Sequence, residues 1–405
     1  MNILSEVLSH IGFEGRKIAV GCEMEKKVSA HDVQKAFLEN LHIAGYFNED
    51  SILEAVNFIR RQNHSNHDSF EKIMEILSSC GASEKHPQKF NANILFNNFS
   101  NHGSFLSEID LKNIIVFLAR KAFGRVAGQE RNELQNHLWS EIYGHNYLEN
   151  AEKLGLILEE KPPEKKYDET WIQGSAYCNM KDRVLYAKKL QDEGYDLGFI
   201  RLLSGERELW LEIDRISKEH LLKLAQKNNI NVVGFVERQV NGHARTYPQY
   251  GEGETRKVTE GLAAQEIYRE IFNVEINDDL VIDAKIHDNA TRVTTASVTA
   301  DLVNQKLAPK ILNNHFLTHE IKILIVTNQP HVERQTLTNK RAAMGELKKF
   351  NIKQKIIFHG SGRKSIASIA EIHSEFGALV SEKYMQELQK DKAHMIKILR
   401  KISSK

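Results

Sequence analysis

The sequence contains few cysteines and few prolines. Its 405 residues include three Cys and six Pro. Cys22, Cys80 and Cys178 are widely spaced and form no CxxC pair, which argues against a disulfide framework or a zinc site. Six prolines argue against long disordered linkers. We therefore expect reduced thiols in a cytoplasmic protein.

The chain also lacks an excess of charge of either sign and a long apolar run. Its 55 Lys and Arg balance 54 Asp and Glu, so the net charge creates no overall electrostatic attraction to nucleic acid or to a membrane surface. The longest apolar run, near Ile114–Ala119, is far shorter than the ~20 residues that span a bilayer. No signal peptide is recognisable at the N-terminus. We predict no nucleic-acid partner and no membrane span, and signal-less secretion into a host cell stays open.

Several phosphate-binding and catalytic motifs are missing as well. The glycine-bearing stretch at 247–255 lacks the GxxxxGK[ST] spacing of a P-loop. No GxGxxG follows the first predicted strand, and no GxSxG is present. The stretch HSNHDSFE at 64–71 is read more simply as a polar loop, with Asp68 capping a helix, than as a metal site. We predict no metal centre.

The first 160 residues have helical periodicity. Apolar residues recur there at three- and four-residue spacing, and Ser or Asp stands near several starts. The predicted helices are Ala30–Leu41, Ser51–Arg61, Ser69–Leu77, Ser104–Phe123 and Glu130–Leu148. These features predict an all-helical N-terminal domain, residues 1–160, which could contact a protein partner. The charged, proline-bearing segment Glu159–Lys166 marks the domain boundary.

Strands and helices alternate after that boundary. The predicted strands are Glu169–Gly174, Gly198–Leu203, Asn231–Val236, Leu280–Ile286, Ile321–Thr327 and Lys355–His359. The predicted helices are Met180–Glu193, Ser217–Asn228, Thr259–Phe272, Thr294–Leu307 and His331–Phe350. The alternation predicts an α/β domain over 161–363, with a Rossmann-like parallel sheet and helices on both faces. The C-terminal helices, 364–405, are expected to pack on this domain.

Polar residues follow the predicted strands of the sheet. In an open parallel sheet such residues meet at one edge, beside helix N-termini that favour anions. The polar corners are Gly174-Ser175, Ser204-Gly205-Glu206, His287-Asp288-Asn289 and Thr327-Asn328-Gln329-Pro330-His331. This edge is the predicted binding site.

The last corner contains a residue pair suited to an anion. Pro330 fits the first turn of a helix, and His331 and Arg334 then share one face at its positive end. Arginine would clamp a phosphate or carboxylate, with histidine as a donor or acid. The alternative is a helix-start histidine and an arginine paired with a surface acid.

Several of these stretches together resemble the YdcF/SanA-like (ElyC-like) domains, over about residues 168–362. Arg183-x3-Ala187-x2-Leu190-x3-Gly194 matches the motif of the family's first helix. Leu202-Leu-Ser204-Gly205, Val258-Thr-Glu260 and Arg292-Val-Thr-Thr295-x-Ser297 follow in the family's order. The last and most specific match is Val326-Thr327-x3-His331-x2-Arg334. In place of the family's glycine-rich first corner, this chain has Gly174-Ser175-Ala176.

The resemblance implies a Rossmann-type domain with a nucleotide or S-adenosylmethionine-like ligand, and it leaves the reaction open between transferase and hydrolase. His331, Glu206 and Glu260 are the candidate catalytic residues. The candidate ligand-binding residues are Gly174, Ser175, Ser204, Gly205, Arg292, Thr295, Thr327, Asn328 and Arg334. Asp283 lies beside them as a weaker candidate. Glu260 is equally well explained as a carboxylate at a helix start.

An insertion of about 50 residues, near 209–257, separates two of the matched motifs and either covers the site or changes its ligand.

Two functions fit the sequence. The first is an enzyme acting on a nucleotide-like or other phosphorylated small molecule. The second is a non-catalytic ligand-binding protein, such as a secreted bacterial effector, whose helical domain contacts a protein partner.

Overall fold

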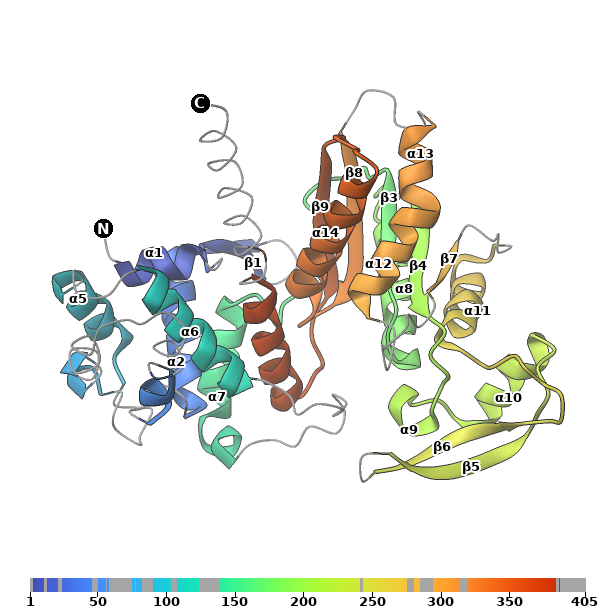
Figure 1. Cartoon of the computed structure of the whole chain (residues 1–405), viewed down its shortest axis with the longest axis horizontal. Coiled ribbons are helices and arrows are strands. Elements are labelled where there is room, and N and C mark those ends of the chain that lie inside the picture. Colours follow the sequence, from blue (N-terminus) through green and yellow to red (C-terminus); the bar gives the residue numbers. More distant parts are fainter. Residues whose placement is uncertain are drawn as a thin grey trace. The chain divides into compact units, whose positions relative to one another are not determined.

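The computed structural model describes residues 3–10, 13–20, 24–45, 50–55, 57, 75–76, 78–81, 90–102, 108–123, 138–240, 243–274, 280–284, 294–313, 320–383 and 386. The chain divides into two compact units (Figure 1). The first comprises Met1–Leu158 and Ser365–Lys405, and the second comprises Glu159–Lys364. The division falls at the start of the charged segment in which the sequence predicts a boundary.

The first unit is mostly helical but also contains a β-hairpin. Its described helices are α1 (Ile3–His10), α2 (Ala30–Ile43), α5 (Ala92–His102), α6 (Glu108–Phe123) and α7 (Leu138–Lys153). Strands β1 (Arg16–Val20) and β2 (Met24–Val28) pair antiparallel. The prediction of an all-helical domain is therefore wrong. The second strand, MEKKV, is too charged to show the apolar alternation that identifies a strand.

The C-terminal helix, residues 369–383, belongs to the first unit and not to the α/β unit. Phe376 is fully buried, and its ring centroid lies 5.5 Å from that of Phe37 and 6.1 Å from that of Phe13. The Tyr147 hydroxyl lies 3.1 Å from His373 Nδ1. The predicted packing of this segment on the α/β domain is wrong, because periodicity shows that a face is buried but not what covers it.

The second unit is built on a five-stranded sheet with the order β7-β4-β3-β8-β9. The strands are β3 (Glu169–Gln173), β4 (Phe199–Gly205), β7 (Val281–Ala284), β8 (Ile321–Asn328) and β9 (Ile356–Arg363). All neighbouring pairs are parallel. The predicted α/β class and parallel sheet are therefore correct.

Helices cover both faces of this sheet. Helices α8 (Tyr177–Asp192) and α11 (Glu260–Phe272) pack on one face, where Ile172, Leu324 and Val326 enter the core. Helices α12 (Thr295–Leu302) and α14 (Val332–Lys349) pack on the other, against residues such as Trp171 and Ile325. A π-helical turn and α13 (Ala308–Leu312) continue α12. The near-continuous apolar sequence of β8 reflects burial on both sides.

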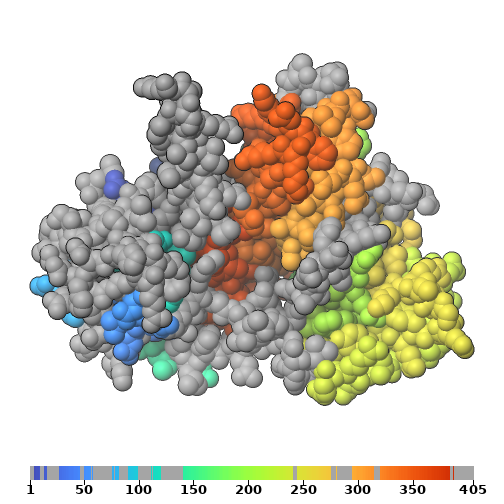
Figure 2. Space-filling view, viewed as in Figure 1, coloured from blue at the N-terminus to red at the C-terminus, as the bar shows by residue number. Residues whose placement is uncertain are grey.

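The insertion between β4 and α11, residues 206–259, folds into structure of its own. It contains α9 (Leu211–Asp214), α10 (Lys218–Lys227) and an antiparallel hairpin of β5 (Val232–Val240) and β6 (His243–Tyr250). Figure 2 shows it within the yellow-green region at the lower right. The predicted strand at 231–236 is thus part of this hairpin and not of the parallel sheet. The sequence missed β6 because Pro248 and polar residues interrupt its pattern, which a two-stranded ribbon tolerates.

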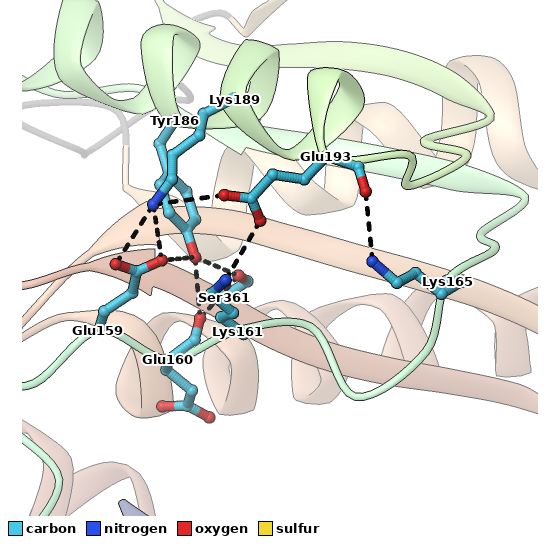
Figure 3. A network of polar contacts seen from close by, with 8 residues as sticks. All are labelled: Glu159, Glu160, Lys161, Lys165, Tyr186, Lys189, Glu193 and Ser361. Atoms are coloured by element: carbon cyan, nitrogen blue, oxygen red, sulfur yellow. Dashed lines mark hydrogen bonds and ion pairs between the residues drawn. The ribbon is translucent and has the colours of Figure 1, made fainter. Parts of the chain in front are cut away.

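The charged segment at the boundary is tied to the sheet (Figure 3). The backbones of Glu160 and Gly362 exchange two hydrogen bonds of 2.8 and 3.0 Å, so the segment pairs with the edge of β9. The Tyr186 hydroxyl lies 3.2 Å from both the Glu160 carbonyl oxygen and Ser361 Oγ. Lys189 Nζ lies 3.1 Å from Glu159. The boundary residues therefore cover an edge strand that would otherwise be open to pairing.

Candidate functional site

The strand order of the sheet reverses between β3 and β8. The chain proceeds from β3 outward through β4 to β7, then returns to the other side of β3 with β8 and continues to β9. In open α/β sheets, ligands bind beyond the carboxyl ends of the strands at such a switch point. Here these ends are Gln173 and Asn328, followed by the turns into α8 and α14. The corners at Gly174-Ser175, Ser204-Gly205-Glu206 and 327–331 lie at the same edge, which we call the carboxyl edge. The predicted corner at 287–289 lies outside the described residues.

Arg183 of α8 joins the two strands at the switch point. Its Nε donates to Asn328 Oδ1 at 2.7 Å, and its Nη1 donates to the carbonyl oxygens of Gln173 and Gly174 at 2.9 and 2.7 Å. The side chain is 1% exposed. Arg183 belongs to the first-helix motif but is not among the predicted site residues. Its buried position inside a helix of mixed charge gives no signal of this role.

The two helices that begin at the switch point have no side-chain N-cap. Ala176 precedes α8 and His331 precedes α14, and neither side chain accepts a hydrogen bond from its helix. By contrast, Ser217, Thr259 and Thr294 cap α10, α11 and α12 through their hydroxyls. The first N–H groups of a helix carry partial positive charge and need an acceptor. At α8 and α14 no side-chain cap supplies it.

His331 and Arg334 lie in the first turn of α14. His331 is the N-cap residue and is 6% exposed, whereas Arg334 is half-buried. Both side chains already interact with other parts of the chain. Pro330 stands before the N-cap residue of α14, so its predicted place in the first helical turn is wrong. The helix begins two residues later, after the turn.

Thr327 and Asn328 face inward at the end of β8. The Thr327 hydroxyl donates to Gln335 of α14, and Asn328 accepts from Arg183 as described above. Asn339, one turn further along α14, accepts from Gln173 Nε2 at 3.3 Å and from Thr299 Oγ1 at 2.7 Å. These buried polar side chains hold the strand ends and helices together. Thr327 and Asn328 therefore support the site more than they line it.

The first corner has no room for a side chain. A methyl group built on Gly174 would lie 2.2 Å from Glu260 Oε1, 2.6 Å from the Leu203 carbonyl oxygen and 3.0 Å from Ser204 Cα. The Gly174 N–H donates to that carbonyl oxygen at 2.6 Å. Glycine is needed here because the end of β4 and the Glu260 carboxyl approach the backbone closely.

Two buried polar atoms at the carboxyl edge have no hydrogen-bond partner in the described part of the chain. They are Ser204 Oγ, at the end of β4, and Gln329 Oε1, in the turn after β8. Each residue is 1% exposed. Buried polar groups are normally satisfied, so unsatisfied ones at one edge point to a missing partner.

Glu260 begins α11 and is held by the insertion. Arg207 Nε donates to Glu260 Oε2 at 3.3 Å, and Asp214 binds the Arg207 guanidinium through both of its oxygens at 3.0 and 2.6 Å. Asp214 is fully buried. Burial raises the pKa of Glu260 from 4.5 to about 7, although Arg207 favours the charged form. A carboxyl group with this pKa exchanges protons near neutral pH.

The remaining predicted residues contribute less. Glu206 is exposed after the end of β4. Gly205 is buried in β4, and Ser175 is half-buried in the turn before α8. Thr295 is the first residue of α12, where Thr294 and Ser297 form a capping box. Arg292 and the side chain of Asp283 lie outside the described residues.

Compared with protein-family models, curated proteins and solved structures, the chain matches none. Among the described residues, no group of three or more His, Cys, Asp or Glu side chains is arranged to hold a metal ion. Within the same residues, no helix has the length and apolar character needed to cross a membrane. The site is therefore interpreted from its own geometry.

Proposed function

We propose that the second unit is a YdcF-like, Rossmann-like domain that binds a phosphate-bearing small molecule, such as a nucleotide, at the switch point between β3 and β8. The order of its strands supports this proposal, because the chain reverses direction across the sheet between these two strands. The resemblance of the motifs around Ser204, Glu260 and His331 supports it from the sequence.

The observation that carries the proposal is that two helix N-termini without a side-chain cap and two buried polar atoms without a hydrogen-bond partner occur at the same edge of the sheet. Helices α8 and α14 start beside the same two strand ends without a side-chain cap. Ser204 Oγ and Gln329 Oε1 lie unpartnered at this edge. A phosphate supplies acceptors to N–H and O–H donors. The Gln329 oxygen instead suits a hydroxyl or amino group of the same ligand.

The charges at the edge agree with an anionic ligand. Arg334 lies in the first turn of α14, where its cation adds to the positive end of the helix. Glu260 is the acidic group closest to Gly174, and burial keeps its pKa near 7. It is therefore largely neutral below that pH and does not then repel a phosphate.

We assign Glu260 and His331 as the proton-transferring groups of an enzyme of the transferase or hydrolase class. Glu260 has a pKa matched to neutral pH, and an imidazole side chain can both donate and accept a proton. Glu206 is not included, because it is exposed and its carboxyl group is not held by the sheet edge as that of Glu260 is held by Arg207. Arg334 then acts as the clamp that orients the phosphate.

Replacing Arg334 with Ala tests the anion site. Adenosine 5′-monophosphate should bind the variant about 10- to 100-fold more weakly than the wild type, because a charge-assisted hydrogen bond is worth about 1.5–3 kcal/mol. Titration calorimetry on the full chain measures the affinity, with adenosine as the phosphate-free probe. Lys340→Ala is the matched control, since Lys340 is an exposed cation further along the same helix.

Two results would contradict the proposal. In one, the wild type binds neither adenosine 5′-monophosphate nor inorganic phosphate. In the other, Arg334→Ala and Lys340→Ala bind the nucleotide equally well.

A further inference from the structure

The carboxyl group of Glu260 has one anchored oxygen and one that faces the first corner of the sheet. Oε2 accepts the hydrogen bond from Arg207 Nε. Oε1 lies so near Gly174 that a methyl group there would be 2.2 Å away, and it accepts no hydrogen bond within the described part of the chain. Ser204, with its unpartnered hydroxyl, lies next to the same glycine. The corner itself is filled, but the Glu260 side chain is 12% exposed, so a ligand group beside the corner would meet an oxygen of Glu260.

The anchor of Glu260 comes from the insertion and is rigidly built. Asp214 accepts two hydrogen bonds from Arg207 and a third from the Trp210 N–H at 2.8 Å. The backbone of Arg207 also accepts from the Glu260 N–H at 2.9 Å. Asp214 is fully buried and the Arg207 side chain is 21% exposed, so water has little access to the carboxylate side of the pair. The position of Glu260 thus depends on residues that a domain without the insertion would lack.

The carboxyl edge has two chemically different halves. Around β3 and β8 it presents helix N-termini and Arg334, which suit an anion. Around β3 and β4 it presents the Glu260 carboxyl, which suits a neutral group that both donates and accepts hydrogen bonds, and the Ser204 hydroxyl is buried beside it. A second anionic group would meet Glu260 there, whereas a hydroxyl group would be bound by it.

We propose that Arg207 and Asp214 form a positioning pair, supplied by the insertion, that directs Glu260 Oε1 into the corner of Gly174 and Ser204. There Glu260 binds a hydroxyl group of the ligand, so the site takes a phosphorylated polyol or sugar in preference to a bare phosphate. This inference rests on the proposed function, because the phosphate of the same ligand occupies the α8 and α14 end.

Burial, which raises the pKa of Glu260, and the charged groups around this carboxyl set the pH range of this recognition. The charged groups are Arg207 from the start of the insertion, Asp214 from α9 and Arg183 from α8. The two arginines favour the carboxylate, and Asp214 favours the neutral acid. A neutral Glu260 donates to a ligand hydroxyl and a charged one accepts from it, so the preference for a hydroxyl persists on both sides of the titration.

The test compares D-ribose 5-phosphate with inorganic phosphate by titration calorimetry on the full chain. The ratio of the two affinities isolates the sugar hydroxyl groups when both probes are titrated at a pH well above the second pKa of either phosphate, so that both are dianions. We expect the wild type to bind ribose 5-phosphate at least about 10-fold more tightly than phosphate. Arg207→Met should reduce that ratio to about two- or threefold, and it should change the affinity for inorganic phosphate by no more than about twofold. Arg207→Lys should have a ratio between those of Arg207→Met and the wild type.

Two further variants keep the test decisive. Arg256→Met removes an arginine of the same insertion that contacts Glu254 and not Glu260, and it should leave the ratio unchanged. Glu260→Ala retains the Arg207–Asp214 pair and should reduce the ratio as Arg207→Met does, so it serves if the latter fails to fold. Binding of phosphate without any preference for ribose 5-phosphate in the wild type would overturn this inference alone. Absence of binding by both probes would overturn the proposed function as well.

Discussion

Arg183→Met is expected to lower the free energy of unfolding of the α/β unit by about 3–5 kcal/mol and to abolish binding of adenosine 5′-monophosphate. Arg183 is 1% exposed and donates to Asn328 Oδ1 and to the carbonyl oxygens of Gln173 and Gly174. Methionine fills much of the same volume but donates no hydrogen bond. Three buried acceptors at the two strand ends then lose their donor at once.

Chemical denaturation with urea measures the loss of stability, and calorimetry measures the loss of binding. Lys181→Met is the control, because Lys181 is an exposed cation of the same helix, and its loss should change stability by less than about 0.5 kcal/mol. Arg183→Lys should fall between the two, since lysine keeps the charge without the planar fork of donors. A stability of Arg183→Met within 1 kcal/mol of the wild type would show that these hydrogen bonds contribute little.

The parallel sheet could be predicted from the sequence because its strands are buried on both faces. Ile323–Val326 is apolar throughout and fully buried, so its pattern is unmistakable beside the amphipathic α14. The hairpin strand β6 was missed for the opposite reason. Among the described strands it pairs with β5 alone, and it carries Pro248 and alternates poorly, so nothing in its local pattern separates it from a loop.

The corners of the candidate site could also be predicted, because topology alone brings the carboxyl ends of parallel strands to one edge. The partners of those corners could not. Arg183 reaches Asn328 across 145 positions of the sequence, and Arg207 reaches Glu260 across 53. Such pairs depend on how helices and the insertion pack, which periodicity does not encode. The partners of Thr327 and Asn328, which are Gln335 and Arg183, could not be predicted for the same reason.

The stability of the α/β unit is expected to depend on pH through Glu260. Burial raises the pKa of this carboxyl group from 4.5 to about 7 in the folded protein. The folded state then binds the proton more tightly than the unfolded state, so the free energy of unfolding falls as pH rises from 4.5 to about 7. At about 1.4 kcal/mol for each tenfold change in proton affinity, the loss is about 3 kcal/mol and persists at higher pH.

Glu260→Gln isolates this effect, because glutamine has nearly the same shape and does not titrate. Urea denaturation at pH 5 and pH 8 gives the stability of both proteins, and titrations elsewhere in the chain cancel in the difference between them. We expect the wild type to lose about 2–3 kcal/mol relative to Glu260→Gln between these two values. Glu254→Gln is the control. Its Arg256 partner lowers the pKa of the Glu254 carboxyl to about 2, so Glu254 stays charged in both folded and unfolded protein across this interval. A difference between wild type and Glu260→Gln that is the same at pH 5 and pH 8 would show that Glu260 is charged in the folded protein at both values. The acid that we assign to proton transfer at neutral pH would then have to be another residue.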